Sequence, residues 1–441
     1  MIDQFQNVFK IPELKKRILF TLGILVIYRL GGHVPTPGIN TVALAEFFAS
    51  SQNTLFGLYD MFAGGSFRKA TVFALGIMPY ISASIILQLL GAVVPYFQKL
   101  QKEGEEGRKK IIQYTRYGTV SIACMQAWGV SIFLENIFTS SGLAAVADPG
   151  YGFRFLTMIT LATGTIFIMW LGEQIDDRGI GNGISLIIFI GIIAQFPNAI
   201  LDEVQQLMAG NRAIITELVL MAVMVLTIAA VVLITQGTRK IPVQYAKRVI
   251  GRKMYGGQST HIPMKVTTAG VMPIIFAQSI MFVPNTVIPL FPDSEIMQTI
   301  GGWFDITSGV YWFFYGMLIV FFTYFYTAIV FNPVDIADNM KKYGGFVPGV
   351  RPGKKTSEFL DYILTRITLP GSVFLALIAI FPYFIMKFTN VSYNFASFYG
   401  GTGLLIVVGV ALDFLQQIES HLLMRHYDGF MKTGRIKSRR F

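Results

Sequence analysis

Ten long apolar runs recur along the chain. An α-helix needs about 20 residues to cross the hydrocarbon core of a bilayer, where every backbone polar group must be satisfied within the helix. The run from 213 to 236 is the clearest, because Glu217 is its only charged residue. The pattern therefore predicts an all-α polytopic membrane protein with ten transmembrane helices, near residues 18–34, 71–97, 117–138, 153–172, 183–201, 213–236, 266–289, 309–331, 367–387 and 401–424.

The first run has an alternative interpretation as a secretory signal peptide. Lys15, Lys16 and Arg17 precede its apolar stretch, and an Ala-x-Ala sequence occurs at 43–45. That sequence lies too far beyond the apolar stretch, across two prolines, to fit the usual cleavage pattern. We therefore expect a retained helix, although Arg29 falls inside it.

Composition supports a membrane protein and argues against an enzyme. Of the 441 residues, 53% are hydrophobic and 14% are charged, whereas soluble domains carry about 25% charged residues. The single cysteine, Cys124, excludes a disulfide framework, and the four histidines lack the spacing of a zinc site. The sequence has no complete phosphate-binding loop and no reactive pair in mid-span. Neither an enzymatic activity nor a cofactor is expected.

Basic residues indicate the orientation of the helices. Lys and Arg are enriched in the cytoplasmic loops of membrane proteins. If the amino terminus is cytoplasmic and the spans alternate, 30 of the 36 Lys and Arg residues fall on the cytoplasmic side. Both termini are therefore expected in the cytoplasm. The six basic residues that remain are Arg29, Arg68, Lys69, Arg154, Arg212 and Lys387.

Two expected cytoplasmic loops, 237–263 and 332–365, are long and basic. Their charge alone could reflect attraction to anionic lipid. Their length favours docking of a large, negatively charged partner, for which ribosomal RNA is one candidate, because a connection between helices needs only a few residues. The Gly- and Pro-rich stretch 343–353 is predicted to be an ordered loop that holds Arg351 in place.

The segment 53–69, on the outer side, is too short and polar to span and too apolar for a free loop. It could be an interfacial helix. It could also re-enter the protein, since irregular backbone at membrane depth must be covered by protein or face a water-filled cavity. Gly64 and Gly65 would then allow it to swing.

Periodicity within the spans gives weaker signals. Ile81 and Ile85 share one helix face, as do Ile184 and Ile188. Contact with lipid or ordinary packing is the usual role of such residues. Gln88 and Gln278 are better evidence of surfaces that face the protein interior. Helix ends or breaks are expected at Pro79, at Pro273 and across 179–183.

Several longer strings resemble the SecY family of protein-translocation channels. They are ALGIMPYISASIIL at 74–87, WLGEQIDDRGIGNGIS at 170–185, QSTHIPMK at 258–265, NPVDIADNMK at 332–341 and GFVPGVRPG at 345–353. The resemblance covers essentially the whole chain. It implies two inverted, pseudo-symmetric halves, helices 1–5 in 18–201 and helices 6–10 in 213–424, around an hourglass pore. A cytoplasmic segment, 1–17, would precede them, and a basic tail, 425–441, would follow.

The resemblance also implies residue roles. A ring of branched side chains would line the constriction: Ile81, Ile85, Ile184, Ile188, Ile275 and Ile406. A plug would lie below this ring, within 53–69: Leu55, Phe56, Leu58, Tyr59, Met61, Phe62, Gly64, Gly65 and Phe67. Contacts to the ribosome or to the SecA motor ATPase would come from Arg248, Arg252, Lys253, Arg351, Lys354 and Lys355. Helices two and three would part from helices seven and eight as a lateral gate.

The implied activity is translocation of unfolded secretory polypeptides across a bacterial plasma membrane, with release of membrane helices into lipid. The implied partners are small SecE-like and SecG-like membrane subunits, SecA, the ribosome, signal sequences with nascent polypeptides, and anionic lipids. A secondary transporter is the main alternative, and it would require a paired ionisable residue near mid-membrane. Arg29 is the only candidate for that role.

Overall fold

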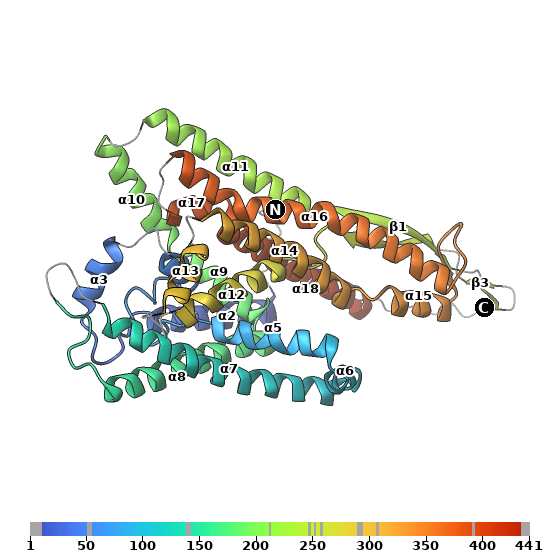
Figure 1. Cartoon of the computed structure of the whole chain (residues 1–441). Coiled ribbons are helices and arrows are strands. Elements are labelled where there is room, and N and C mark those ends of the chain that lie inside the picture. The colour runs from blue at the N-terminus through green and yellow to red at the C-terminus, as the bar shows by residue number, and fades with distance from the viewer. Residues whose placement is uncertain are drawn as a thin grey trace.

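The computed structural model describes residues 11–50, 55–137, 143–210, 213–245, 248–250, 253–255, 259–288, 294–305, 308–389 and 393–433. It is a bundle of helices from which a small β-sheet projects at one end (Figure 1).

The helices before residue 211 are α2 (Pro12–Gly31), α3 (Thr41–Ser50), α4 (Leu55–Phe62), α5 (Met78–Val93), α6 (Pro95–Lys102), α7 (Glu105–Glu135), α8 (Tyr151–Arg178), α9 (Gly183–Ile193) and α10 (Phe196–Met208). Those that follow are α11 (Ile214–Gln236), α12 (Met272–Val287), α13 (Glu295–Trp303), α14 (Gly309–Val330), α15 (Pro333–Lys342), α16 (Lys354–Thr389), α17 (Tyr393–Tyr399) and α18 (Gly401–Thr433). The strands are β1 (Thr238–Tyr245), β2 (Arg248–Ile250), β3 (Lys253–Tyr255), β4 (Ser259–Lys265) and β5 (Gly345–Phe346).

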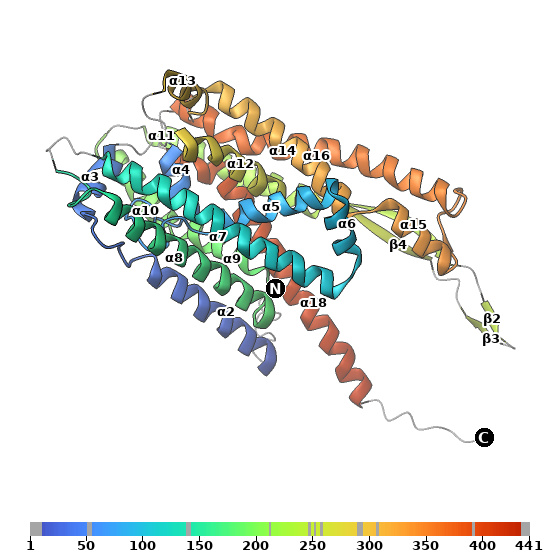
Figure 2. The same cartoon turned by 60° about the horizontal axis from the view of Figure 1, so that its bottom comes forward.

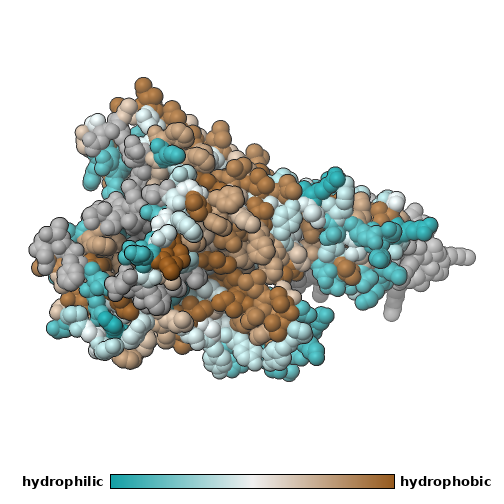
Figure 3. All heavy atoms as spheres, in the orientation of Figure 1, coloured by the Kyte–Doolittle hydropathy of each residue, from teal (hydrophilic) through white to brown (hydrophobic). Residues whose placement is uncertain are grey.

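Among the residues described, seven helices are long and apolar enough to cross a membrane, and the bent pair α5–α6 makes an eighth. The other two expected spans correspond to α2, which carries four basic residues, and to α12, which has only 16 residues. On the face shown in Figure 3, apolar residues form a band across the middle of the molecule, and polar residues lie towards its two ends. This band is where a bilayer would lie.

Two predicted runs, 71–97 and 266–289, are longer than the helices they contain. Residues 72–77 and 266–271 form turns, so α5 begins at Met78 and α12 at Met272. A proline lies in the first turn of each helix, as expected. A third proline, Pro95, bends the chain by 97° between α5 and α6 (Figure 2), because the residue before proline disfavours helical backbone.

The same short motif precedes both of these helices. The sequence is Gly-Ile-Met-Pro at 76–79 and Gly-Val-Met-Pro at 270–273. Gly76 and Gly270 have φ angles of 57° and 59°, which suit glycine because it lacks a Cβ atom. The two helices, α5 and α12, pack against each other. This repeat was not predicted from the sequence, and it is consistent with a chain built from two related halves.

The cytoplasmic loops predicted at 237–263 and 332–365 fold together as one unit. β1 pairs with β4 in antiparallel register, from Thr238 opposite Lys265 to Gln244 opposite Ser259. β5, from the second loop, joins the other edge of β1. Ile241 and Val243 of the sheet pack with Leu360 of α16 in one apolar cluster. Ordered loops were predicted here from the sequence, but these strands were not. β2 and β3 form a separate hairpin beyond the sheet.

We predict that Gly183→Ala destabilises the break between α8 and α9. A Cβ at 183 would overlap the carbonyl oxygen of Gly172, which is backbone and cannot rotate away. Overpacking of this kind costs about 1–3 kcal/mol, measurable as a lower Tm in detergent. The control is Gly152→Ala in α8, where no atom lies within 4 Å of the new Cβ. Equal Tm values for the two variants would show that the α8–α9 contact is not tightly packed.

Candidate functional site

Five of the six isoleucines predicted to line the constriction are buried. Ile81 and Ile85 come from α5, Ile188 from α9, Ile275 from α12 and Ile406 from α18. All five belong to the largest apolar cluster of the protein. Ile184 is half-buried, and its Cγ1 lies 3.3 Å from the position of a Cβ at Gly172 of α8. The fold therefore gathers the predicted residues in one core, with Ile184 towards its α8 side.

The helices that carry these residues contact one another in pairs. The Ser279 hydroxyl of α12 lies 3.9 Å from the Met78 sulfur of α5. The backbone N–H of Gly181, just before α9, donates to Gln417 Oε1 of α18 at 2.9 Å. Gln278 is 1% exposed and donates to Tyr311 of α14 at 3.4 Å, which confirms that it faces the interior. The six isoleucines thus come from four helices, two from each half of the chain, which contact each other as the pairs α5–α12 and α9–α18.

The predicted plug segment lies against this core. Its helix, α4, contacts α9 and α17. Within it, Met61 and Phe62 are buried, and the Ser397 hydroxyl donates to the Met61 sulfur at 3.2 Å. The rings of Tyr59 and Phe62 meet Phe282 of α12 edge-on at 5.2 and 6.2 Å. Phe67 packs against Tyr59 at 4.9 Å. For Leu55, Phe56 and Leu58 the structure describes the backbone only, and residues 53–54 lie outside the described ranges.

Two contacts locate the segment relative to the isoleucines. A Cβ at Gly64 would lie 3.0 Å from Gly191, which follows Ile188 by three residues on α9. Phe282 follows Ile275 by seven residues on α12. At 1.5 Å per residue, these offsets are about 4.5 and 10 Å along the helices. The segment 55–67 therefore sits one to two helical turns from the isoleucine cluster.

Polar contacts hold the segment in this position. Asp60 is 5% exposed, and its Oδ1 accepts from the Arg68 backbone N–H at 2.9 Å. Its Oδ2 lies 3.7 Å from the Arg68 guanidinium. The Gln195 amide donates to the Asp60 carbonyl at 3.2 Å and to Oδ2 at 3.4 Å. Burial raises the pKa of the Asp60 carboxyl, while Arg68 and Gln195 act in the opposite direction.

Arg29 supports the same segment from α2. Its Nη1 donates to the Gly64 carbonyl oxygen at 2.8 Å. Arg29, the only candidate for a transporter site, thus stabilises an irregular stretch of backbone. The roles of Asp60 and Gln195 were not predicted from the sequence. An aspartate inside the apolar string Leu58–Phe62 was the available signal, but its partner lies 135 residues away.

The predicted cytoplasmic contact residues lie at the opposite end from the plug. Arg351 is exposed, and its carbonyl oxygen accepts from the Thr356 hydroxyl at 2.9 Å. Lys354 and Lys355 begin α16, and Lys355 pairs with Glu358 at 2.8 Å. For Arg248 and Lys253 only the backbone of β2 and β3 is described, and Arg252 lies outside the described residues. Within the described ranges, no cluster of His, Cys, Asp and Glu could hold a metal ion.

A helical membrane bundle with an apolar core closed by a short inserted segment is the architecture of a protein-conducting channel. A family model described as SecY matches residues 71–415. The chain is 44% identical over 429 residues to protein translocase subunit SecY of Escherichia coli K12, covering 96% of this chain and 95% of that protein. It is 42% identical to the Aquifex aeolicus subunit over 433 residues, with 98% and 100% covered. The chain belongs to the SecY family.

Solved structures agree on the fold. The structure titled "The structure of a protein conducting channel" aligns with a TM-score of 0.63 at 18% identity, covering 94% of this chain and 96% of that one. Sec61 in the canine ribosome-channel complex aligns with a TM-score of 0.58 at 17% identity, covering 94% and 96%. The predicted family, the helical channel fold and the channel function are confirmed. This chain is a multi-pass membrane protein of a channel family rather than an enzyme.

We predict that Asp60→Ala loosens the plug segment. The change leaves the buried donors of Arg68 and Gln195 without their carboxylate, at a cost of about 1–3 kcal/mol. If the seated segment seals the pore, ion conductance of the reconstituted protein in planar bilayers should rise several-fold. Asp60→Asn retains one carbonyl oxygen, so its effect should be smaller. Asp148→Ala, at an exposed aspartate of the α7–α8 connection, is the control. Wild-type conductance in Asp60→Ala would exclude a sealing role for this carboxylate.

Proposed function

We propose that this protein translocates unfolded polypeptides through the space between α5, α9, α12 and α18, and releases apolar segments sideways into a bacterial plasma membrane. The observation that carries the proposal is the burial of five branched side chains, from both halves of the chain, beside a short inserted helix. Membership of a family of translocase subunits supports the same function.

The ring would act as a deformable apolar gasket. Ile81, Ile85, Ile184, Ile188, Ile275 and Ile406 offer no hydrogen bonds to water or ions, so a narrow passage between them disfavours both. Side chains are held there by dispersion contacts that are individually weak. A passing polypeptide can therefore displace them a little at a time, and the ring can close around it again.

The segment 53–69 would seal the resting pore on the outer side. Its apolar residues from Tyr59 to Phe67 fill the space between α9, α12 and α17, and Asp60 and Arg29 supply directional bonds. A structure of the SecY protein whose title says that its plug domain stabilises the closed state aligns with this chain at a TM-score of 0.63 and 19% identity. Displacing the segment would open the pore.

The lateral gate would have α5 and α7 on one side and α12 and α14 on the other. Across this seam, Met78 faces Ser279, and the aromatic rings of Tyr59 and Phe62 bridge from the plug to Phe282. These contacts involve thioether, hydroxyl and aromatic groups, which separate at a lower cost than buried ion pairs. An apolar segment that leaves the pore here gains about 25 cal/mol for each Å² of apolar surface that it removes from water.

The sheet and the β2–β3 hairpin would project into the cytoplasm, together with both termini and the tail 425–441. Basic residues there suit an acidic partner: Arg248, Arg252, Lys253, Arg351, Lys354 and Lys355. Two structural neighbours are ribosome complexes by title, one canine and one of yeast Ssh1 bound to the 80S ribosome. We infer that the ribosome and a SecA motor dock on this end. SecE-like and SecG-like subunits and anionic lipids would surround the bundle, and signal sequences would enter through the gate.

Photocrosslinking tests the proposed pathway. A photoreactive residue at Ile85, in membranes that contain a stalled secretory precursor, should crosslink to the precursor only when the signal sequence is intact. The control position is Leu226 of α11, which is 69% exposed and faces away from the core. A crosslink at 226 but not at 85 would contradict the proposed pore and reopen the transporter alternative.

Charge reversal tests the cytoplasmic docking surface. Arg351→Glu should reduce post-translational export by an order of magnitude or more, because an exposed guanidinium that pairs with an acidic partner becomes repulsive. Lys342→Glu, at an exposed lysine that ends α15 nearby, should have a much smaller effect. Protein abundance and Tm should stay unchanged in both variants. Normal export by Arg351→Glu would remove this residue from the docking surface.

A further inference from the structure

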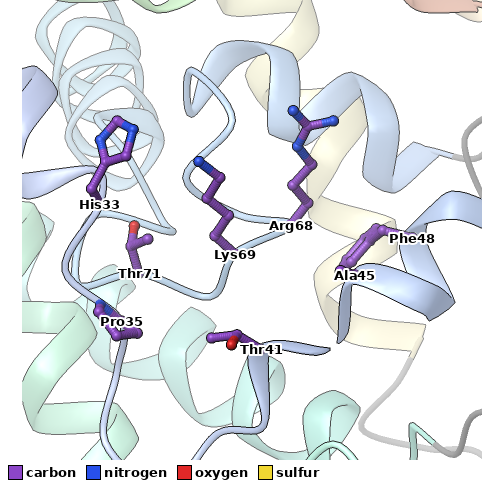
Figure 4. Close-up of a pocket in the computed structure, with 8 residues that line it drawn as sticks. All are labelled: His33, Pro35, Thr41, Ala45, Phe48, Arg68, Lys69 and Thr71. Atoms are coloured by element: carbon purple, nitrogen blue, oxygen red, sulfur yellow. The ribbon is translucent and has the colours of Figure 1, made fainter. Parts of the chain in front are cut away.

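A cavity of about 490 Å³ opens beside the plug segment, at the end of the molecule opposite the sheet. It lies among α3, the end of α2 and the connection from α4 to α5. The residues that line it are His33, Pro35, Thr41, Ala45, Phe48, Arg68, Lys69 and Thr71 (Figure 4). Three of these eight side chains are basic or can become so, and none is acidic. This is unusual on a side where only 6 of 36 Lys and Arg residues are expected.

The basic groups are placed to act together. In Figure 4 the side chains of Arg68 and Lys69 point in the same direction, and the His33 ring lies on the Lys69 side. His33 Nδ1 lies 2.9 Å from the Arg29 carbonyl oxygen and donates to it, since a carbonyl only accepts. His33 can therefore offer a second donor only when its ring is charged. Arg68 and Lys69 are the permanent cations of the cavity.

We propose that this cavity binds the phosphate of an anionic phospholipid headgroup from the outer leaflet. Arg and Lys are the usual ligands of phosphate oxygens. The volume exceeds what a free phosphate ion needs, and Pro35, Ala45 and Phe48 add apolar surface to the lining. Val34 and Val42, beside the cavity, are 53% and 69% exposed and suit contact with acyl chains. An amphipathic anion fits all of these features.

The bound phosphate would share Arg68 with the plug. The Arg68 guanidinium lies 3.7 Å from Asp60 Oδ2, and its side chain is 38% exposed. A phosphate in the cavity would draw this cation away from Asp60, so lipid binding and the Asp60 contact compete. Placing the cavity at the outer leaflet rests on the proposed orientation. Binding itself depends on neither orientation nor translocation.

Chemical labelling of lysine tests the site without a transport assay. The full-length chain, with its co-purifying subunits, is placed in nanodiscs of phosphatidylcholine with or without phosphatidylglycerol, and acetylation of each lysine is followed by mass spectrometry. Phosphatidylglycerol should slow acetylation of Lys69 about fivefold relative to Lys387, an exposed lysine at the same end of the bundle. Lys387 corrects for the general effect of surface charge on the reagent.

Two variants and a competing anion test whether the protection of Lys69 comes from a lipid phosphate in this cavity. Arg68→Gln should abolish most of the protection of Lys69, and Asp60→Asn should increase it, because a competing negative charge is removed. Equal Lys69 rates in the two nanodiscs would overturn the proposal. Millimolar inorganic phosphate that protects Lys69 equally well in phosphatidylcholine nanodiscs would overturn the lipid assignment in favour of a free phosphate site. Protection by phosphatidylglycerol with failed export would leave the lipid site standing and count against the proposed function alone.

Discussion

The constraint on which this fold depends is that irregular backbone inside a membrane protein must find its hydrogen bonds within the protein. The connection from α4 to α5 has no regular structure, yet it enters the bundle. Its polar groups are bonded by neighbours: the Val72 N–H donates to the Val34 carbonyl oxygen at 2.9 Å, and Arg29 reaches Gly64. Gly164 of α8 lets the Val72 carbonyl oxygen approach where a Cβ would overlap it. These contacts fix the start of α5 and thereby the position of Ile81 and Ile85.

The two elements proposed to close the pore are built differently. A ring of isoleucines makes no directional bonds, so it can deform and recover. The plug segment is held by Asp60 and Arg29, and hydrogen bonds to charged groups contribute about 1.5–3 kcal/mol each. A few such bonds hold the segment firmly at rest. The free energy of these bonds is no larger than an entering apolar segment could supply, since each CH₂ group that it buries contributes about 0.8 kcal/mol. In the proposed mechanism, the ring would tolerate variety in the polypeptide and the plug segment would set the threshold for opening.

Hydropathy predicted the spans best where most of a helix surface is exposed at the outside of the bundle. The run 213–236 became α11 at 214–236, a helix with few buried residues. It failed at 71–77, where a mostly buried turn is as apolar as a buried helix, and at 266–271, where a partly buried turn precedes α12. Ile241 and Val243 are buried alternately in β1, and this apolar period of two residues is visible in the sequence as a strand signal. The pairing of β1 with β4 and β5 joins residues far apart in the chain, so the sequence alone did not predict it. The role of Asp60 was missed for the same reason, since Gln195 approaches it only in the folded chain.

The internal repeat relates the positions of four predicted ring isoleucines to the starts of their helices. Ile81 and Ile275 each follow a left-handed glycine by five residues, at Gly76 and Gly270. Ile188 and Ile406 likewise stand five residues after Gly183 and Gly401, which begin α9 and α18. Each residue turns an α-helix by about 100°, so one inserted residue after any of these glycines would rotate its isoleucine away from the core. The left-handed glycines lie at or just before the starts of α5, α12 and α18, whereas Gly183 has no left-handed φ angle and Asn182 caps α9. In the proposed pore, the shared spacing would place one isoleucine from each of four helices at the constriction.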